Sequence, residues 1–205
     1  MISYNGRLRV VGSTLREGSS SLGALRRALS AEEAGAEVEL FDLRELGLPM
    51  YEPGRPLEDY GSEVRRFVEA IGGADALIIS TAAYHGTLAG VTKNALDFTQ
   101  FLAGEERPYL EGRVVGLIST AGGDRAAANT TDAMVHIVHA LRGVVAPQMV
   151  NMGQARRRTD AGNVTDEGYG RRLDRLGGLF VEMAGGLSVA RGSHGRAGEA
   201  LGVAV

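Results

Sequence analysis

Short apolar runs alternate along this chain with stretches whose apolar residues recur at helical spacing. The predicted strands, which are apolar runs or stretches with alternating apolar residues, occupy 7–11, 38–43, 76–80, 114–118 and a stretch that begins at 144. The predicted helices occupy 22–34, 61–71, 91–102, 126–141 and a last stretch that Thr165 or Asp166 caps and that reaches about Met183. Strands that alternate with helices in this way form βαβ units around a parallel sheet. The pattern therefore predicts a doubly wound, three-layer α/β sandwich with a five-stranded parallel sheet.

Composition narrows the class of protein. The 205 residues suffice for one domain, which we expect at 1–185, followed by a glycine-rich tail at 186–205. The net charge of −3 provides no basic field, so we expect no nucleic-acid partner, and the absence of cysteine excludes disulfides and thiolate metal sites. We find neither a signal-peptide pattern nor an apolar run that could span a bilayer, and we therefore expect no membrane partner and a cytoplasmic location.

The loop after the first predicted strand has the chemistry of a phosphate site. It joins the strand to a helix, whose first backbone N–H groups are unpaired and carry the positive end of the helix dipole. Its candidate phosphate-binding side chains are Ser13, Arg16, Ser19, Ser20 and Ser21. Ordinary turn and N-cap chemistry explains the same residues equally well. Five residues separate Gly12 from Gly18 with no lysine after them, and the second glycine of a dinucleotide fingerprint is missing. A monophosphate is therefore favoured.

Two further loops follow predicted inner strands and carry small residues. Parallel α/β sheets bind ligands outside the carboxyl ends of their strands, where these loops must meet. The candidate ligand-binding residues in them are Ala82, Ala83, Tyr84, His85, Gly86, Thr120, Ala121, Gly122 and Gly123. Small residues let the backbone approach a flat ring, and exposed N–H groups can donate to its edge. Together with the phosphate loop, these loops fit flavin mononucleotide (FMN).

The same loops resemble those of the NAD(P)H-dependent FMN reductases, a family of the flavodoxin-like superfamily. The resemblance rests on the Gly-Ser and arginine loop with its serines at 12–21, on Tyr84-His85-Gly86, on Gly-x-x-Lys-Asn-x-x-Asp at 90–97, and on the turn at 119–123. The arginine falls one residue later than in the commonest form of the motif, and Ala83 replaces a frequent proline. The resemblance implies a flavodoxin-like fold, bound FMN, and NADPH or NADH as the electron donor.

A hydride step between nicotinamide and flavin needs no general base, so we name no catalytic residue. The resemblance implies a small-molecule electron acceptor such as a quinone, an azo compound, a metal oxyanion or free flavin, and a flavin-dependent monooxygenase as a further partner. A flavodoxin-type FMN electron carrier without nicotinamide activity is the alternative. A hydrolase without flavin is disfavoured, because the chain contains no G-x-S-x-G motif.

Several charged and aromatic residues lie outside these loops. The run Arg156-Arg157-Arg158 is interpreted as a solvated face, with a phosphate or partner contact as the alternative. His136 and His139 share a helix face, but zinc needs three or four ligands, so we expect no metal site. The helix after Gly90 combines Leu96, Phe98, Phe101 and Leu102 with the Tyr84 loop. This apolar surface predicts a homodimer or a homotetramer.

Overall fold

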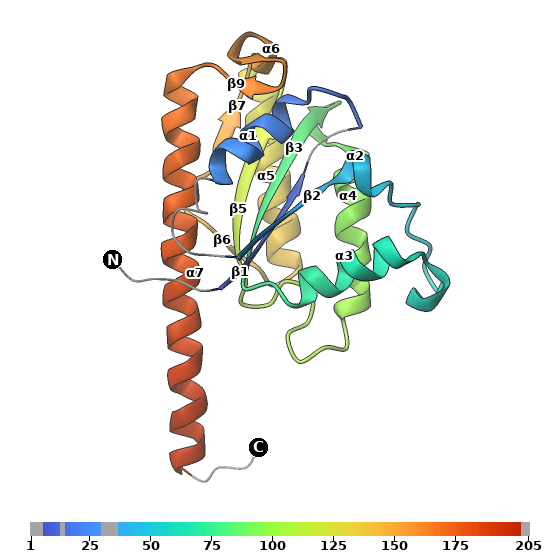
Figure 1. Cartoon of the computed structure of the whole chain (residues 1–205), viewed down its shortest axis with the longest axis vertical. Helices are drawn as coiled ribbons and strands as arrows, with labels where there is room; N and C mark the ends of the chain where they lie inside the picture. Colours follow the sequence, from blue (N-terminus) through green and yellow to red (C-terminus); the bar gives the residue numbers. More distant parts are fainter. Residues whose placement is uncertain (1–5, 13–14, 30–36, 202–205) are drawn as a thin grey trace.

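A parallel sheet runs through the centre of the molecule, and its strand order is that of a flavodoxin (Figure 1). The computed structural model describes residues 6–12, 15–29 and 37–201. In the sheet the order is β2 (Glu37–Asp42), β1 (Arg7–Gly12), β3 (Ala76–Tyr84), β5 (Val114–Thr120) and β6 (Val144–Val145). These neighbours all pair in parallel. The strand order reverses between β1 and β3, which is where folds of this type bind ligands. The predicted fold class is thereby confirmed.

The sheet position beside β5 is occupied by two short strands. After β6, the strand β7 (Val150–Met152) also pairs in parallel with β5. Pro147 lies between the two segments and has no N–H to donate to a sheet. The single fifth strand expected from the sequence is therefore divided.

Helices cover both faces of the sheet in three layers. On one face lie α1 (Ser20–Ala28) and α7 (Glu167–Leu201), and on the other α3 (Ser62–Gly72), α4 (Gly90–Asp97) and α5 (Asp124–Ala140). Strand β3 supplies both cores, because Ile78 belongs to the cluster with α1 and α7 whereas Leu77 and Ile79 belong to the other. The shorter elements are α2 (Leu43–Leu46), β4 (Thr87–Leu88), α6 (Ala155–Arg158), β8 (Thr159–Asp160), β9 (Asn163–Val164) and two 3₁₀ segments at Leu57–Asp59 and Phe98–Leu102.

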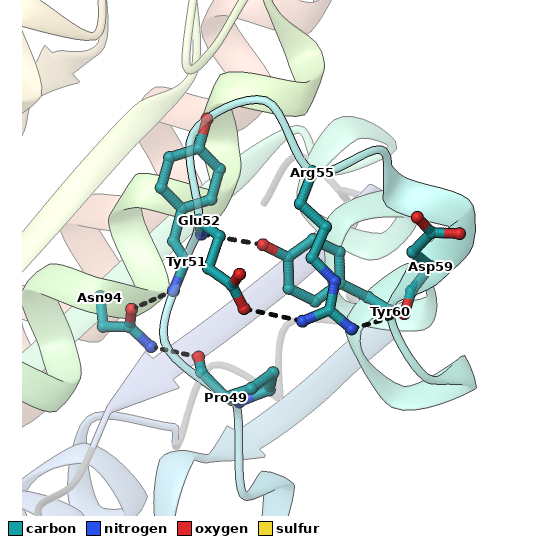
Figure 2. Close-up of polar contacts among 7 residues, drawn as sticks. All are labelled: Pro49, Tyr51, Glu52, Arg55, Asp59, Tyr60 and Asn94. Atoms are coloured by element: carbon teal, nitrogen blue, oxygen red, sulfur yellow. Dashed lines mark hydrogen bonds and ion pairs between the residues drawn. The ribbon is translucent and has the colours of Figure 1, made fainter.

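A proline-rich loop after α2 is fastened to α4 by one asparagine. Figure 2 shows the Asn94 carboxamide facing the loop backbone, where its Nδ2 donates to Pro49 O at 2.7 Å and its Oδ1 accepts from Tyr51 N at 2.8 Å. Farther along the loop, the guanidinium of Arg55 lies 4.3 Å from the centre of the Tyr60 ring. Met50, between the two residues that Asn94 binds, is 72% exposed. The Met50 side chain therefore lies in solvent, although hydrogen bonds to Asn94 fix the loop backbone on either side of it.

The aromatic residues after Gly90 pack inside their own protomer. Phe98 is fully buried, Leu96 and Leu102 are buried, and Phe101 packs against the same core. Tyr51 and Tyr60 meet Phe98 edge to face. The expectation that this helix presents its apolar residues to a second protomer is therefore wrong for these side chains.

Helix α7 begins at a charged cap. The Oδ1 of Asp166 accepts a hydrogen bond from Tyr169 N at 3.1 Å, and its Oδ2 accepts from Arg158 Nη1 at 2.7 Å. The Tyr169 N–H and the Arg158 guanidinium hold the pKa of the Asp166 carboxyl below its usual range. Of the two caps that the sequence allowed, the structure uses Asp166.

The same helix is longer than expected. It continues to Leu201 instead of ending about Met183, and its last part projects beyond the rest of the molecule (Figure 1). Its glycines lower helix propensity by about 1 kcal/mol each, whereas a proline would break the helix, and 167–201 contains none. The division of the chain at residue 185 stays a prediction. Across the described residues, no helix combines the length and apolarity that a bilayer crossing requires.

The backbone of the β8–β9 hairpin packs directly against the start of α1. A Cβ placed on Gly23 of α1 would lie 1.4 Å from the carbonyl oxygen of Gly162, the second residue of the hairpin turn. The hydroxyls of Ser20 and Thr159 share a hydrogen bond of 2.9 Å across the same contact. On the outer side of α1, Arg27 forms a two-pronged ion pair with Asp174 of α7, with both N···O distances 2.7 Å. Helix α1 is thus fixed between the hairpin and α7.

We predict that Gly23→Ala destabilises the protein by about 1–3 kcal/mol or more, because a backbone oxygen occupies the space that the methyl group needs. Gly178→Ala is the matched control, since Gly178 is also inside a helix and a Cβ there would meet nothing within 4 Å. The control should stabilise by about 0.5–1 kcal/mol through helix propensity. Urea unfolding of the two variants measures both effects. Equal midpoints for Gly23→Ala and the wild type would contradict the hairpin contact.

Candidate functional site

An open pocket of about 610 Å³ lies at the carboxyl edge of the sheet. Four chain segments line it, each at or just beyond the carboxyl end of one of the strands β1, β3, β5 and β7. The lining residues are Arg16, Ser19, Ser20, Ala82, Ala83, Tyr84, Thr120, Ala121, Gly122, Gln154, Ala155, Arg156 and Arg157. Its volume is that of an ordinary small-molecule or cofactor site. Three of the four segments are the loops that the sequence predicts to meet.

The first segment leads into the start of α1. The N–H groups of Ser20, Ser21 and Leu22 lie in the first helical turn and, in the described part of the chain, donate to no acceptor. Arg16 is exposed, and its Nη2 makes one long contact of 3.4 Å to Gly18 O. Unpaired N–H groups beside a loosely held guanidinium are an arrangement that suits an anion.

The serines of this segment have different positions. All three serines of α1 and its cap are buried, but Ser19 and Ser20 line the pocket, whereas Ser21 does not and shares a hydrogen bond of 2.7 Å with the Ser19 hydroxyl. Ser13, also predicted to contact the phosphate, lies outside the described residues. Two of the four predicted serines therefore face the pocket directly.

The second segment is a strand extension and not a loop. Strand β3 continues to Tyr84, and residues 84 and 87 pair across a two-residue turn made by His85 and Gly86. Both turn residues have positive φ, which is typical of a tight type I′ hairpin. Ala82, Ala83 and the half-exposed Tyr84 line the pocket, but His85 and Gly86 lie at the exposed tip and do not. The hairpin thus gives the pocket a wall of two small residues, Ala82 and Ala83, with Tyr84 at its edge.

The third segment is the last residue of β5 and the turn that follows it. Thr120, Ala121 and Gly122 line the pocket, whereas Gly123 caps α5 and does not. Ala121 uses both its backbone groups internally, since its N–H donates to Met152 O and its carbonyl accepts from Ala155 N, each at 2.9 Å. In the described part of the chain the N–H groups of Gly122 and Gly123 have no such acceptor. Gly122 therefore offers a free donor at the pocket wall.

The fourth segment, Gln154 to Arg157, was not among the predicted ligand residues. It follows β7 directly, so a fourth strand ends at the same edge as the other three. Its place is set by Gly153, where a Cβ would lie 2.0 Å from Asp124 Oδ1 at the start of α5. The run of arginines after an apolar stretch was the sequence signal, but a run of charges is usually a solvated face.

The three consecutive arginines have two different roles. Arg156 and Arg157 are exposed and line the pocket. Arg158 points away to the scaffold, where its Nε donates to Gly153 O at 2.9 Å and its Nη1 pairs with Asp166. Its guanidinium also lies 4.5 Å from the centre of the Tyr169 ring. Arg158 therefore fastens the segment that carries the other two.

The pocket is positively charged within an acidic protein. The chain has a net charge of −3, yet the charged residues lining the pocket are Arg16, Arg156 and Arg157. Such a site favours an anionic ligand. In the described part of the chain no group of three or more His, Asp or Glu residues could hold a metal ion, and His136 and His139 are exposed on α5.

The residues of the pocket fit the parts of flavin mononucleotide. The unpaired N–H groups at the start of α1, with Arg16 and the two serines, suit the phosphate. The wall of Ala82 and Ala83 leaves space for a flat ring, and Tyr84 stands at its edge. The Gly122 N–H suits the polar edge of that ring.

Comparison with known proteins gives sequence relatives. An NAD(P)H-dependent FMN reductase of Pseudomonas aeruginosa is 32% identical over 113 residues, which are 55% of this chain and 58% of that protein. The chain thus spans a little over half the length of this relative. An FMN-dependent NADPH-azoreductase of Staphylococcus haemolyticus is 28% identical over 65% of this chain and 72% of its own.

Solved structures share the fold at low sequence identity. The flavoenzyme NAD(P)H:(acceptor) oxidoreductase FerB from Paracoccus denitrificans superposes with a TM-score of 0.69 at 21% identity, over 87% of this chain and 97% of its own. An oxidoreductase of Corynebacterium diphtheriae superposes with a TM-score of 0.68 at 19% identity, over 89% of this chain and 98% of its own.

The family itself is shown by a model of NADPH-dependent FMN reductases, which matches residues 7–157. That range contains all four segments of the pocket and confirms the resemblance seen in the sequence. Since the match covers most of its length, the chain belongs to the NADPH-dependent FMN reductase family.

Proposed function

We propose that this protein is an FMN-dependent oxidoreductase that takes hydride from NAD(P)H and passes electrons to a small-molecule acceptor. The observation that carries the proposal is the pocket itself, which joins an anion site at the start of α1 to a flat wall of small residues. Membership of the family supports the same function. The curated relatives named above are an FMN reductase and an azoreductase, so their names leave several acceptor classes open.

The residues of the pocket would bind and orient FMN. The first turn of α1, Ser19, Ser20 and Arg16 would hold its phosphate, and Ala82, Ala83 and Tyr84 would lie along its ring. The Gly122 N–H would donate to the ring edge where negative charge grows on reduction. Bound FMN would supply the two-electron chemistry, and the protein would hold nicotinamide and flavin at reacting distance.

The visible spectrum under argon tests the function. Protein loaded with FMN should be yellow, and addition of NADPH or NADH should bleach the flavin band within the time of mixing, because hydride transfer reduces the ring. A subsequent pulse of quinone or azo dye should restore the colour. Protein that binds FMN and stays yellow with both nicotinamides would be an electron carrier and would contradict the proposal.

We also propose a homodimer in which the second protomer helps to close the flavin site. Leu15 and Tyr84 are large apolar residues that are 65% and 50% exposed, and both line a second depression of about 470 Å³ beside the main pocket. That depression continues over Val91 of α4, one helical turn before Asn94, which fixes the loop of the exposed Met50. Assembly into a tetramer, the cytoplasmic location and a monooxygenase partner stay predictions.

Light scattering at micromolar concentration should give twice the protomer mass for the wild type. Met50→Lys should shift the protein toward monomer, because it places a charge in an apolar contact. Val144→Lys is the control, since Val144 is also an exposed apolar residue but lies on the far strand β6. A wild-type monomer that still binds and reduces FMN would rule out the dimer.

A further inference from the structure

The flavin phosphate leaves two of the pocket's three arginines without a counter-charge. A phosphate at the start of α1 would carry nearly two negative charges at neutral pH. The helix end supplies about half a positive charge and Arg16 supplies one, so the first segment alone nearly balances it. Arg156 and Arg157 line the same pocket, and no carboxylate lines it with them. Two guanidiniums therefore remain available for a second anion.

The positions of these two arginines are fixed by backbone hydrogen bonds, and among the described residues their side chains have no charged partner. The Arg157 N–H donates to Gln154 O at 2.9 Å, and the neighbouring Ala155 is bound to the loop after β5. The side chain of Arg157 makes one contact of 3.5 Å with the neutral Gln154 amide, at the limit of a hydrogen bond. In the described part of the chain, neither guanidinium forms an ion pair with a carboxylate.

The position of the pair suits a ligand that enters after the flavin. Thr159, which follows the pair closely in the sequence, contacts Ser20, so the segment lies beside the start of α1 at the phosphate end of the pocket. Both arginines are exposed. A nicotinamide that stacks on the flavin ring must direct the adenosine end of its dinucleotide toward the rim. NADPH differs from NADH there by one dianionic phosphate on the adenosine ribose.

We propose that Arg156 and Arg157 form a second anion subsite that binds the 2′-phosphate of NADPH and makes this protein prefer NADPH to NADH. The inference rests on the proposed function of the pocket. A phosphate monoester offers three acceptor oxygens, and two adjacent guanidinium forks can each bind it through paired N–H groups. NADPH and NADH both contain the pyrophosphate, so contacts to the pyrophosphate would not distinguish one coenzyme from the other.

The test compares two probes that differ in the 2′-phosphate alone, adenosine 2′,5′-bisphosphate and adenosine 5′-monophosphate. Calorimetric titration of FMN-loaded wild type should show tighter binding of the bisphosphate. Arg156→Gln/Arg157→Gln should weaken the bisphosphate by about tenfold to a hundredfold, the range for hydrogen bonds to a charged group, and barely affect the monophosphate. The KM for NADPH should rise by a similar factor and that for NADH little.

The control is Arg65→Gln/Arg171→Gln, which removes the same charge from two exposed arginines outside the pocket. It should leave all these affinities near the wild-type values. Equal weakening of both probes in the pocket variant would overturn the proposal, and so would wild-type protein that does not distinguish them. Weakened FMN binding in the pocket variant would assign the pair to the flavin phosphate and would also overturn it.

The two proposals fail in different ways. If the wild type does not bind FMN, the proposed function fails, and the same probes are then titrated into the flavin-free protein. Discrimination that depends on Arg156 and Arg157 would still support the subsite there, and its absence would refute it.

Discussion

The contact between the start of α1 and the β8–β9 hairpin determines the shape of the pocket. Gly23 approaches the Gly162 carbonyl so closely that no Cβ could fit at Gly23. This contact fixes the first and fourth segments of the pocket relative to each other, and the hydrogen bonds of Ala121 fix the fourth to the third. Backbone contacts thus position three arginines, Arg16, Arg156 and Arg157, whose guanidiniums meet no carboxylate among the described residues that line the pocket. Preorganisation of this kind lowers the conformational cost of binding.

Charge is distributed so that the site differs from the rest of the molecule. Several arginines elsewhere are paired with carboxylates, as Arg27 is with Asp174, Arg158 with Asp166 and Arg142 with Glu111. The three arginines of the pocket meet no carboxylate in it. A local positive field inside an acidic protein attracts small anions without attracting nucleic acid. Phosphorylated cofactors and substrates are the ligands that this arrangement suits.

Much of the fold could be predicted from the sequence because its signals are local. The buried strand predicted at 76–80 is apolar except for Ser80, and amphipathic helices such as α3 show their spacing directly. The extension of β3 to Tyr84 was missed, because Ala82 and Ala83 carry no strand signal and the pairing with β4 is decided by the turn at His85 and Gly86. The length of α7 was missed because glycine weakens a helix without ending it.

The site could be predicted in part for the same reason. Loops after successive parallel strands must meet at one edge, so Arg16, Ala82 and Gly122 were brought together by topology. The sequence favours a solvated face for Arg156 and Arg157 over a phosphate contact, because the close packing at Gly153 and Gly162 that places them at the pocket leaves no signal in a run of charges. The burial of Phe98 also depends on tertiary contacts, here with Tyr51 and Tyr60, that helical spacing does not reveal.

Phosphorus NMR of bound FMN tests the central claim, that the pocket holds a phosphate dianion at the start of α1. Free FMN titrates with a second phosphate pKa of about 6. In the complex, hydrogen bonds and positive charge favour the dianion, so its resonance should stay at the dianion position from about pH 5 to about pH 8. In Arg16→Ala the titration should move back toward that of free FMN. A bound phosphate that titrates as free FMN does would contradict the account.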